Sequence, residues 1–168
     1  MPPYQPLQAA AEAGEYDGMN ALVVRTDFTN EDAWNQVREE LRLPLFDNPA
    51  DPYLISDPTY AGALTERVLQ DVQETLSSLV PPGWAAPCLP GAVFIADSTT
   101  MNETGHPLLA VSTEPDGEAF EDDEEDFVTQ FRLLPSAAIE ISINLELGNV
   151  DFVEFAGDGT GVYERMLD

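Results

Sequence analysis

The chain has 168 residues, of which 43% are hydrophobic, and this size and composition predict one domain with a substantial core. It carries 32 Asp and Glu residues against six Arg and no Lys, which gives a net charge of -26. Such a charge repels nucleic acids and anionic membranes, so we expect neither direct nucleic-acid binding nor membrane association. The acidity indicates either adaptation for solubility in a salty interior or attraction of a basic protein partner.

Strand and helix signals alternate along most of the chain, after a Pro- and Ala-rich segment at 1–19 that we expect to be a flexible tail. In order, the patterns predict a strand at 21–26, a helix capped by Thr29 or Asn30 and ended by Pro44, a strand at 53–57, a helix at 64–80, and strands at 91–97, 107–114 and 127–134. The helix at 64–80 is the clearest element, because its apolar residues share one face. Residues 98–106 are expected to form a loop.

The segment at 138–147, AIEISINLEL, gives contradictory signals. Its isoleucines and leucines alternate with polar residues, as in a strand with one buried face. Ser136 before it and Gly148 after it are typical of the N-cap and the C-terminal residue of a helix. We predict a broadly buried helix, with an apolar stripe at Ile139, Ile143 and Leu147 and with Ile141 and Leu145 on another side. A second short helix capped by Asn149 is expected after it.

A Gly-rich turn at 157–163 is expected to lead into a final short strand. This order of elements predicts an α/β (α+β) fold, with a mixed β-sheet of about five strands flanked by three to four helices. We expect a single domain at 20–168.

Six acids in succession lie between two of the predicted strands, and they are Glu121, Asp122, Asp123, Glu124, Glu125 and Asp126. Like charges at this density resist compact structure, so 115–126 is expected to be a solvated acidic loop. The same run is a candidate binding surface for an Arg- or Lys-rich partner.

Polar residues follow the predicted strands at places where ligands bind in open α/β sheets. Asp27 follows the first strand, Asp97 ends the third, and Asp57 lies at the end of the second. Arg25 lies inside an apolar strand, where an unpaired charge is costly, so we expect it to pair with one of these carboxylates. The group is either a structural ion pair with turn-forming aspartates or an acid–base or ligand-clamping site.

His106 is the only histidine and is either a structural hydrogen-bonding residue or a general base beside Asp97. The lone Cys88 lies 18 residues before it, but no local signature supports a Cys–His pair. Trp34 and Asn144 are further candidates for ligand contact.

A zinc site built from several Cys and His ligands is excluded by these counts, and no calcium-binding loop pattern occurs, so we expect no metal and no cofactor. The N-terminal residues lack a basic and an apolar signal region, so we expect a cytoplasmic protein. The oligomeric state stays open.

Several segments together resemble a known family, namely LVVRTDFTNEDAW, DPTYAG, FIADSTT, HPLLAV, FRLLPS and INLELGNVDFVEFAGDGTGVYER. The family is one of small acidic proteins, found mainly in actinobacteria and described as a domain of unknown function. The resemblance extends from about residue 21 to 165 and implies no activity, ligand or catalytic residue. The proline-rich tail and the acidic insertion depart from the family's compact pattern.

Two functions fit these observations. The first is a non-catalytic protein-interaction module, inhibitory or immunity-like, whose partner is basic. The second is a small enzyme or small-molecule-binding protein with a polar site at the strand ends, made by Arg25, Asp27, Asp97 and His106. The absence of a catalytic signature favours the first and leaves an enzymatic role without specific support.

Overall fold

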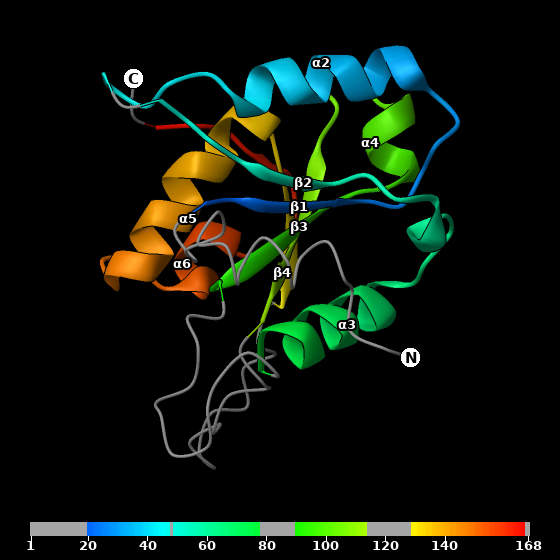
Figure 1. Cartoon of the computed structure of the whole chain (residues 1–168). Coiled ribbons are helices and arrows are strands. Elements are labelled where there is room, and N and C mark those ends of the chain that lie inside the picture. Colours follow the sequence, from blue (N-terminus) through cyan, green and yellow to red (C-terminus); the bar gives the residue numbers. More distant parts are fainter. Residues whose placement is uncertain (1–19, 48, 78–89, 114–128, 167–168) are drawn as a thin grey trace.

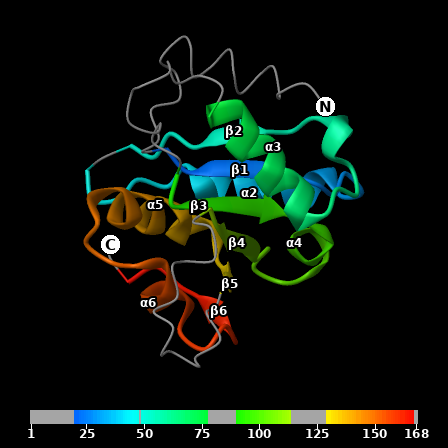
Figure 2. The same cartoon turned by 90° about the horizontal axis from the view of Figure 1, so that it is seen from below.

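A six-stranded mixed sheet forms the centre of the molecule in the computed structural model, which describes residues 20–47, 49–77, 90–113 and 129–166 (Figure 1). The strands are β1 (Leu22–Arg25), β2 (Tyr53–Ile55), β3 (Ala92–Ala96), β4 (Leu108–Ser112), β5 (Gln130–Leu133) and β6 (Val162–Tyr163). Their order across the sheet is β2-β1-β3-β4-β5-β6 (Figure 2). β1 is parallel to β2 and β3, β4 is antiparallel to both of its neighbours, and β6 is parallel to β5.

Helices cover both faces of this sheet, and they are α2 (Glu31–Leu41), α3 (Thr65–Ser77), α4 (Ser98–Asn102), α5 (Ala138–Leu147) and α6 (Phe152–Ala156). The predicted α/β class with a mixed sheet is confirmed, with one strand more than the five expected. The structure corrects the predicted loop at 98–106, which contains α4. That helix has five residues and no apolar periodicity, and it depends on a capping box between Asp97 and Thr100.

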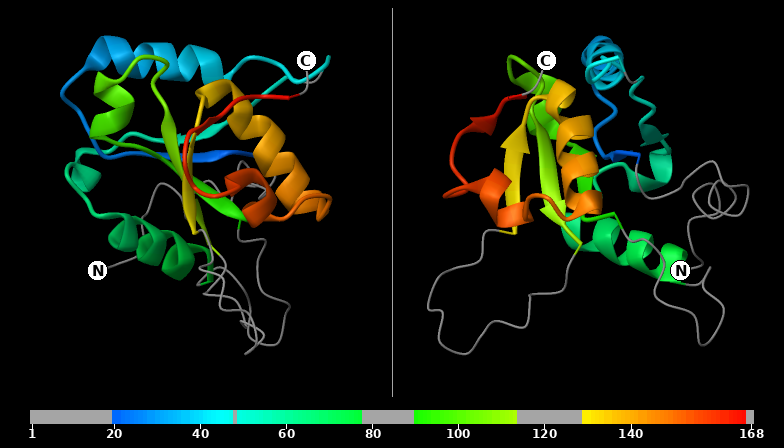
Figure 3. Two further views of the ribbon diagram at one scale, coloured as in Figure 1. Left: turned by 180° about the vertical axis from the view of Figure 1, so that it is seen from behind. Right: turned by 90° about the vertical axis from the view of Figure 1, so that its left-hand side faces the viewer.

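The two faces of the sheet bury separate apolar clusters, as the opposite positions of α2 and α3 show (Figure 3). On one face, Val23 and Phe94 pack with residues of α2, α4, α5 and α6, among them Trp34. On the other face, Val24 packs with Val68 of α3. Alternate residues of the central strands point to opposite faces, so these strands are buried on both sides and are almost continuously apolar.

The segment AIEISINLEL is a helix, α5, as predicted, and Gly148 ends it with a left-handed φ of 66°. The predicted stripe is wrong. Ile141 is fully buried, whereas Leu147 is 59% exposed and Ile139 and Ile143 line a surface pocket with Leu41. The buried face instead runs through Ala138, Ile141 and the partly buried Leu145, three and four residues apart.

Both predicted N-caps in this region need correction. Ser136 lies within a 3-10 turn, Pro135–Ala137, and α5 begins after Ala137 without a side-chain cap. Asp151, not Asn149, caps α6, and it does so in a capping box with Glu154. At the start of α5, the 3-10 turn Pro135–Ala137 takes the place of a capping side chain.

Some predictions concern residues that lie outside those described. They are the flexible tail at 1–19, the acidic loop at 115–126 with its run from Glu121 to Asp126, and Cys88. In the described part of the chain, no helix has the length and apolar character that spanning a bilayer requires.

Candidate functional site

One edge of the sheet collects the polar residues that follow the parallel strands. The carboxyl ends of β1, β2 and β3 lead into Asp27, Asp57 and Asp97. β4 runs in the opposite direction, so His106, which precedes it, lies at the same edge. Since ligands of open α/β sheets bind at this edge, the partners of each side chain decide whether a site is formed there.

Arg25 is held by groups other than those predicted. Its side chain is 3% exposed and forms an ion pair of 3.0 Å with Glu31, while its Nε donates to the backbone carbonyl of Asp27. The guanidinium lies 4.5 Å from the ring centre of Phe28 and 5.1 Å from that of Trp34. The prediction that Arg25 pairs with a strand-end carboxylate is therefore wrong, because the first turn of α2 brings Glu31 within reach instead.

Asp97 pairs with Arg132 of β5, a residue that the sequence analysis did not single out. Two parallel hydrogen bonds of 2.8 Å join the guanidinium and the carboxylate, and both side chains are about three-quarters buried. Burial alone would raise the pKa of Asp97, but hydrogen bonds and charge from Arg132, with help from Thr100, lower it below its usual value. The sequence signal that could have identified Arg132 was its charge inside a predicted apolar strand, which is the signal that identified Arg25.

Asp27 and Asp57 each close a tight turn at the end of their strand. In both, one carboxylate oxygen accepts hydrogen bonds from the backbone N–H and the hydroxyl of the threonine two residues later, at 2.5 to 2.8 Å. The sequence pattern is Asp-x-Thr, in Asp27-Phe28-Thr29 and Asp57-Pro58-Thr59. These contacts match the turn-forming role of aspartate.

His106 connects two helices. Its Nδ1 lies 3.0 Å from the carbonyl oxygen of Thr100 in α4, so this nitrogen carries a proton, and its Nε2 lies 2.8 Å from the side-chain oxygen of Gln36 in α2. The residue has a positive φ of 50°, which is uncommon for a side chain of this size. Burial raises the pKa of the neighbouring Glu40, and the coulombic effect of His106 opposes that rise.

The remaining single-residue candidates serve the packing of helices. Trp34 is 2% exposed and belongs to the core, and Asn144 donates a hydrogen bond of 2.8 Å to the carbonyl of Glu140 one turn earlier in α5. Trp34 reaches the strand-end edge only through its ring contact with Arg25.

The four residues proposed for a polar strand-end site are brought to one edge but not into one cluster. Among the described residues, no hydrogen bond joins the side chains of Arg25, Asp27, Asp97 and His106 to one another. The described residues also contain no group of three or more His, Cys, Asp or Glu side chains placed to hold a metal ion. Each side chain is instead engaged by a turn, a helix or an ion pair.

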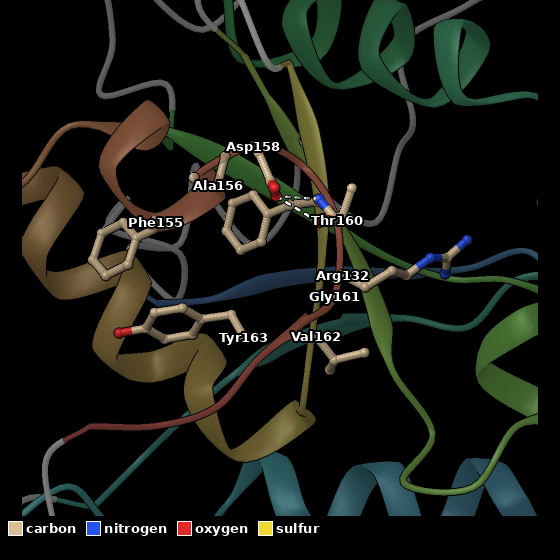
Figure 4. Close-up of a pocket in the computed structure, with 10 residues that line it drawn as sticks. Arg132, Phe155, Ala156, Asp158, Thr160, Gly161, Val162 and Tyr163 are labelled. Atoms are coloured by element: carbon tan, nitrogen blue, oxygen red, sulfur yellow. Dashed lines mark hydrogen bonds between the residues drawn. The ribbon is translucent and has the colours of Figure 1, made fainter.

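A pocket beside the edge strand β6 was missed from sequence. It is a half-open hollow lined by α6, the Gly-rich turn after it and strands β5 and β6, and its volume is about 280 Å³ (Figure 4). Phe155 and Tyr163 line it with their rings 5.4 Å apart and nearly perpendicular. The available signal was the alternation of glycine with Asp158 and Thr160, which the sequence analysis assigned only to a turn.

The family model described as Domain of unknown function (DUF6924) matches residues 20–166. No curated protein matches the chain.

Proposed function

Because the chain belongs to the family Domain of unknown function (DUF6924), whose description names no activity, we propose a function from its own charge and geometry: it is a non-catalytic protein-interaction module for a basic partner. The observation that carries this proposal is the excess of carboxylates over cations. If each of the six arginines neutralised one of the 32 acids, 32 − 6 = 26 carboxylates would still lack a cationic side-chain partner.

The arginines are also engaged within the chain. Arg25, Arg67 and Arg132 form ion pairs with acids, and Arg38, Arg42 and Arg165 donate hydrogen bonds to oxygen atoms of the chain. Exposed acids such as Asp32 and Glu39 of α2 and Glu66 of α3 lie on helices that cover opposite faces of the sheet, so the negative charge extends over the folded domain. A surface of this kind attracts basic proteins and accelerates their association.

The inhibitory or immunity-like role follows if this surface covers the working site of the partner. A basic enzyme that acts on an anionic substrate would be blocked, because the acidic domain would compete for the same positive surface. The alternative of a small enzyme or small-molecule binder at the strand ends has less support, since Arg25, Asp27, Asp97 and His106 already have structural partners.

The proposal is tested by isolating partners from the source cell's extract with the immobilised full-length chain, and then measuring the affinity of each purified partner. We expect a basic protein that binds saturably at about 0.1 M salt and much more weakly at about 1 M, where the Debye length falls from roughly 10 to 3 Å. Absence of such a partner, or binding that does not change with salt, would contradict the proposal.

A further inference from the structure

The pocket beside α6 has a defined shape because its loop is locally fixed. Gly157, Gly159 and Gly161 all have positive φ values, of 57°, 79° and 80°, which glycine adopts at little cost. Between them, Asp158 accepts hydrogen bonds from the backbone N–H of Thr160 at 2.9 Å and from its hydroxyl at 2.6 Å. The loop is therefore a formed wall of the pocket.

The inner wall is aromatic and rigid. Phe131 and Phe155 are 4% and 9% exposed, and Tyr163 is held by a hydrogen bond of 3.1 Å from its hydroxyl to the buried Glu140. Phe155 and Tyr163 make an edge-to-face contact at 5.4 Å, and Phe131 and Tyr163 make another at 6.4 Å. Tyr163 is the ring of this wall that stays partly exposed, and an accessible ring face attracts a cation.

The charge at the pocket is negative. Asp158 is exposed, and the hydrogen bonds from Thr160 lower the pKa of its carboxyl, so it is ionised at neutral pH. Both bonds reach one carboxylate oxygen, and within the described residues the other oxygen accepts no hydrogen bond. Among the described residues that line the pocket, Arg132 is the only cation. Its guanidinium extends away from the rings in Figure 4 and is neutralised by Asp97.

The chain already binds two of its own guanidinium groups with an aromatic ring and a carboxylate. Arg25 lies over Phe28 and pairs with Glu31, and Arg67 lies 5.7 Å from the ring centre of Tyr60 and 4.0 Å from Asp71. A planar guanidinium suits this combination better than an ammonium, because it stacks on a ring while its N–H groups donate to a carboxylate oxygen.

We propose that this pocket takes one arginine side chain of the basic partner, with the guanidinium between the aromatic wall and Asp158. The inference rests on the proposed function and specifies its anchor. The size agrees with a single side chain, because pockets for drug-sized ligands start at roughly 300 Å³ and this one has about 280 Å³.

The first experiment is an NMR titration of the full-length chain with Nα-acetylarginine amide, with the neutral isostere Nα-acetylcitrulline amide as the control. We expect saturable shifts confined to residues 155–163 with the arginine compound and none with the citrulline compound. Nα-acetyllysine amide should bind more weakly than the arginine compound. Shifts spread over the acidic residues of α2 and α3, or equal shifts with citrulline, would overturn the inference.

The second experiment compares two substitutions that remove the same charge. Asp158→Asn keeps an oxygen acceptor for the turn, and Glu66→Gln alters an exposed acid of α3. We expect Asp158→Asn to raise the dissociation constant for the arginine compound, and for the protein partner, by roughly fivefold to tenfold, and Glu66→Gln to change it by less than about twofold.

The outcomes separate this inference from the proposed function. Equal effects of the two substitutions on a basic partner that binds with salt sensitivity would refute the arginine pocket and leave the interaction module intact. Failure to find any salt-sensitive basic partner would instead contradict the proposed function, while the titration with the arginine compound would still decide whether the pocket binds a guanidinium.

Discussion

Removing the Asp97 carboxylate should destabilise the domain by two separable amounts. Asp97→Ala removes the N-cap of α4, which costs about 1 kcal/mol, and leaves the three-quarters-buried Arg132 without its charged partner, which costs about 2 kcal/mol more. Asp97→Asn keeps an acceptor for the cap and loses only the charge, so about 2 kcal/mol is expected in place of about 3. The corresponding decreases in Tm are roughly 4–8 °C for Asp97→Asn and roughly 6–12 °C for Asp97→Ala.

Urea unfolding of Asp97→Asn, Arg132→Gln and the double variant measures the contribution of the pair itself. We expect a coupling free energy of about 1–2 kcal/mol, above the 0.2–1 kcal/mol of exposed pairs, because the geometry is bidentate and largely buried. A coupling within about 0.5 kcal/mol of zero, the range found for independent sites, would refute this reasoning.

The same pair predicts a dependence on pH. The pKa of Asp97 is lower in the folded state than its ordinary value of 3.8, so its contribution to stability is fully present above that value. The contribution is lost as the pH falls through the lowered folded pKa. The stability difference between the wild type and Asp97→Asn should therefore shrink in acid, and a difference that does not change with pH would contradict this assignment.

Two further predictions concern Tyr163, which contacts the buried carboxylate of Glu140 in α5, and the buried face of that helix. The pKa of Tyr163 is raised to about 12, by burial first and then by Glu140. The resulting stabilisation is present below pH 10 and is lost as the pH rises toward 12. Tyr163→Phe should cost about 1 kcal/mol at neutral pH, measured by urea unfolding, and should remove the decrease in stability between pH 10 and 12. Ile141→Ala should cost about 2–5 kcal/mol in the same assay, whereas Leu147→Ala, at a position 59% exposed, should cost less than about 0.5 kcal/mol; equal costs would contradict the assigned buried face of α5.

The elements with strong local signals were predictable from sequence. The strands near 21–26 and 91–97 are largely apolar runs, and they became the adjacent parallel strands β1 and β3. Helix α5 was predicted from the flanking Ser136 and Gly148 despite its alternating pattern, and of these two only Gly148 acts as a cap. Its buried face was not predictable, because it depends on the close approach to β3, where a side chain at Gly91 would lie 2.9 Å from Leu145.

The candidate site was less predictable than the fold, because its partners come from distant parts of the chain. Arg25 was expected to need a partner and Asp97 was a strand-end candidate, but 35 residues separate Asp97 from Arg132. Glu31 is only six residues from Arg25, yet the strand-end carboxylates were expected to be the partners of Arg25. Pairing across a sheet depends on strand order, and local patterns do not contain that order.

β1 lies between β2 and β3, so the parallel half of the sheet can form only after both of these later strands have been synthesised. Leu22 pairs with Tyr53, 53 − 22 = 31 residues later, and Val24 pairs with Ile95, 95 − 24 = 71 residues later. During synthesis, the parallel half of the sheet stays open until β3 has left the ribosome, so an apolar strand edge is exposed for that time. Residues 1–96 carry 14 acids against four arginines, a net charge of 4 − 14 = −10, and the repulsion between such nascent chains opposes aggregation at the stage when the unpaired strand is most exposed.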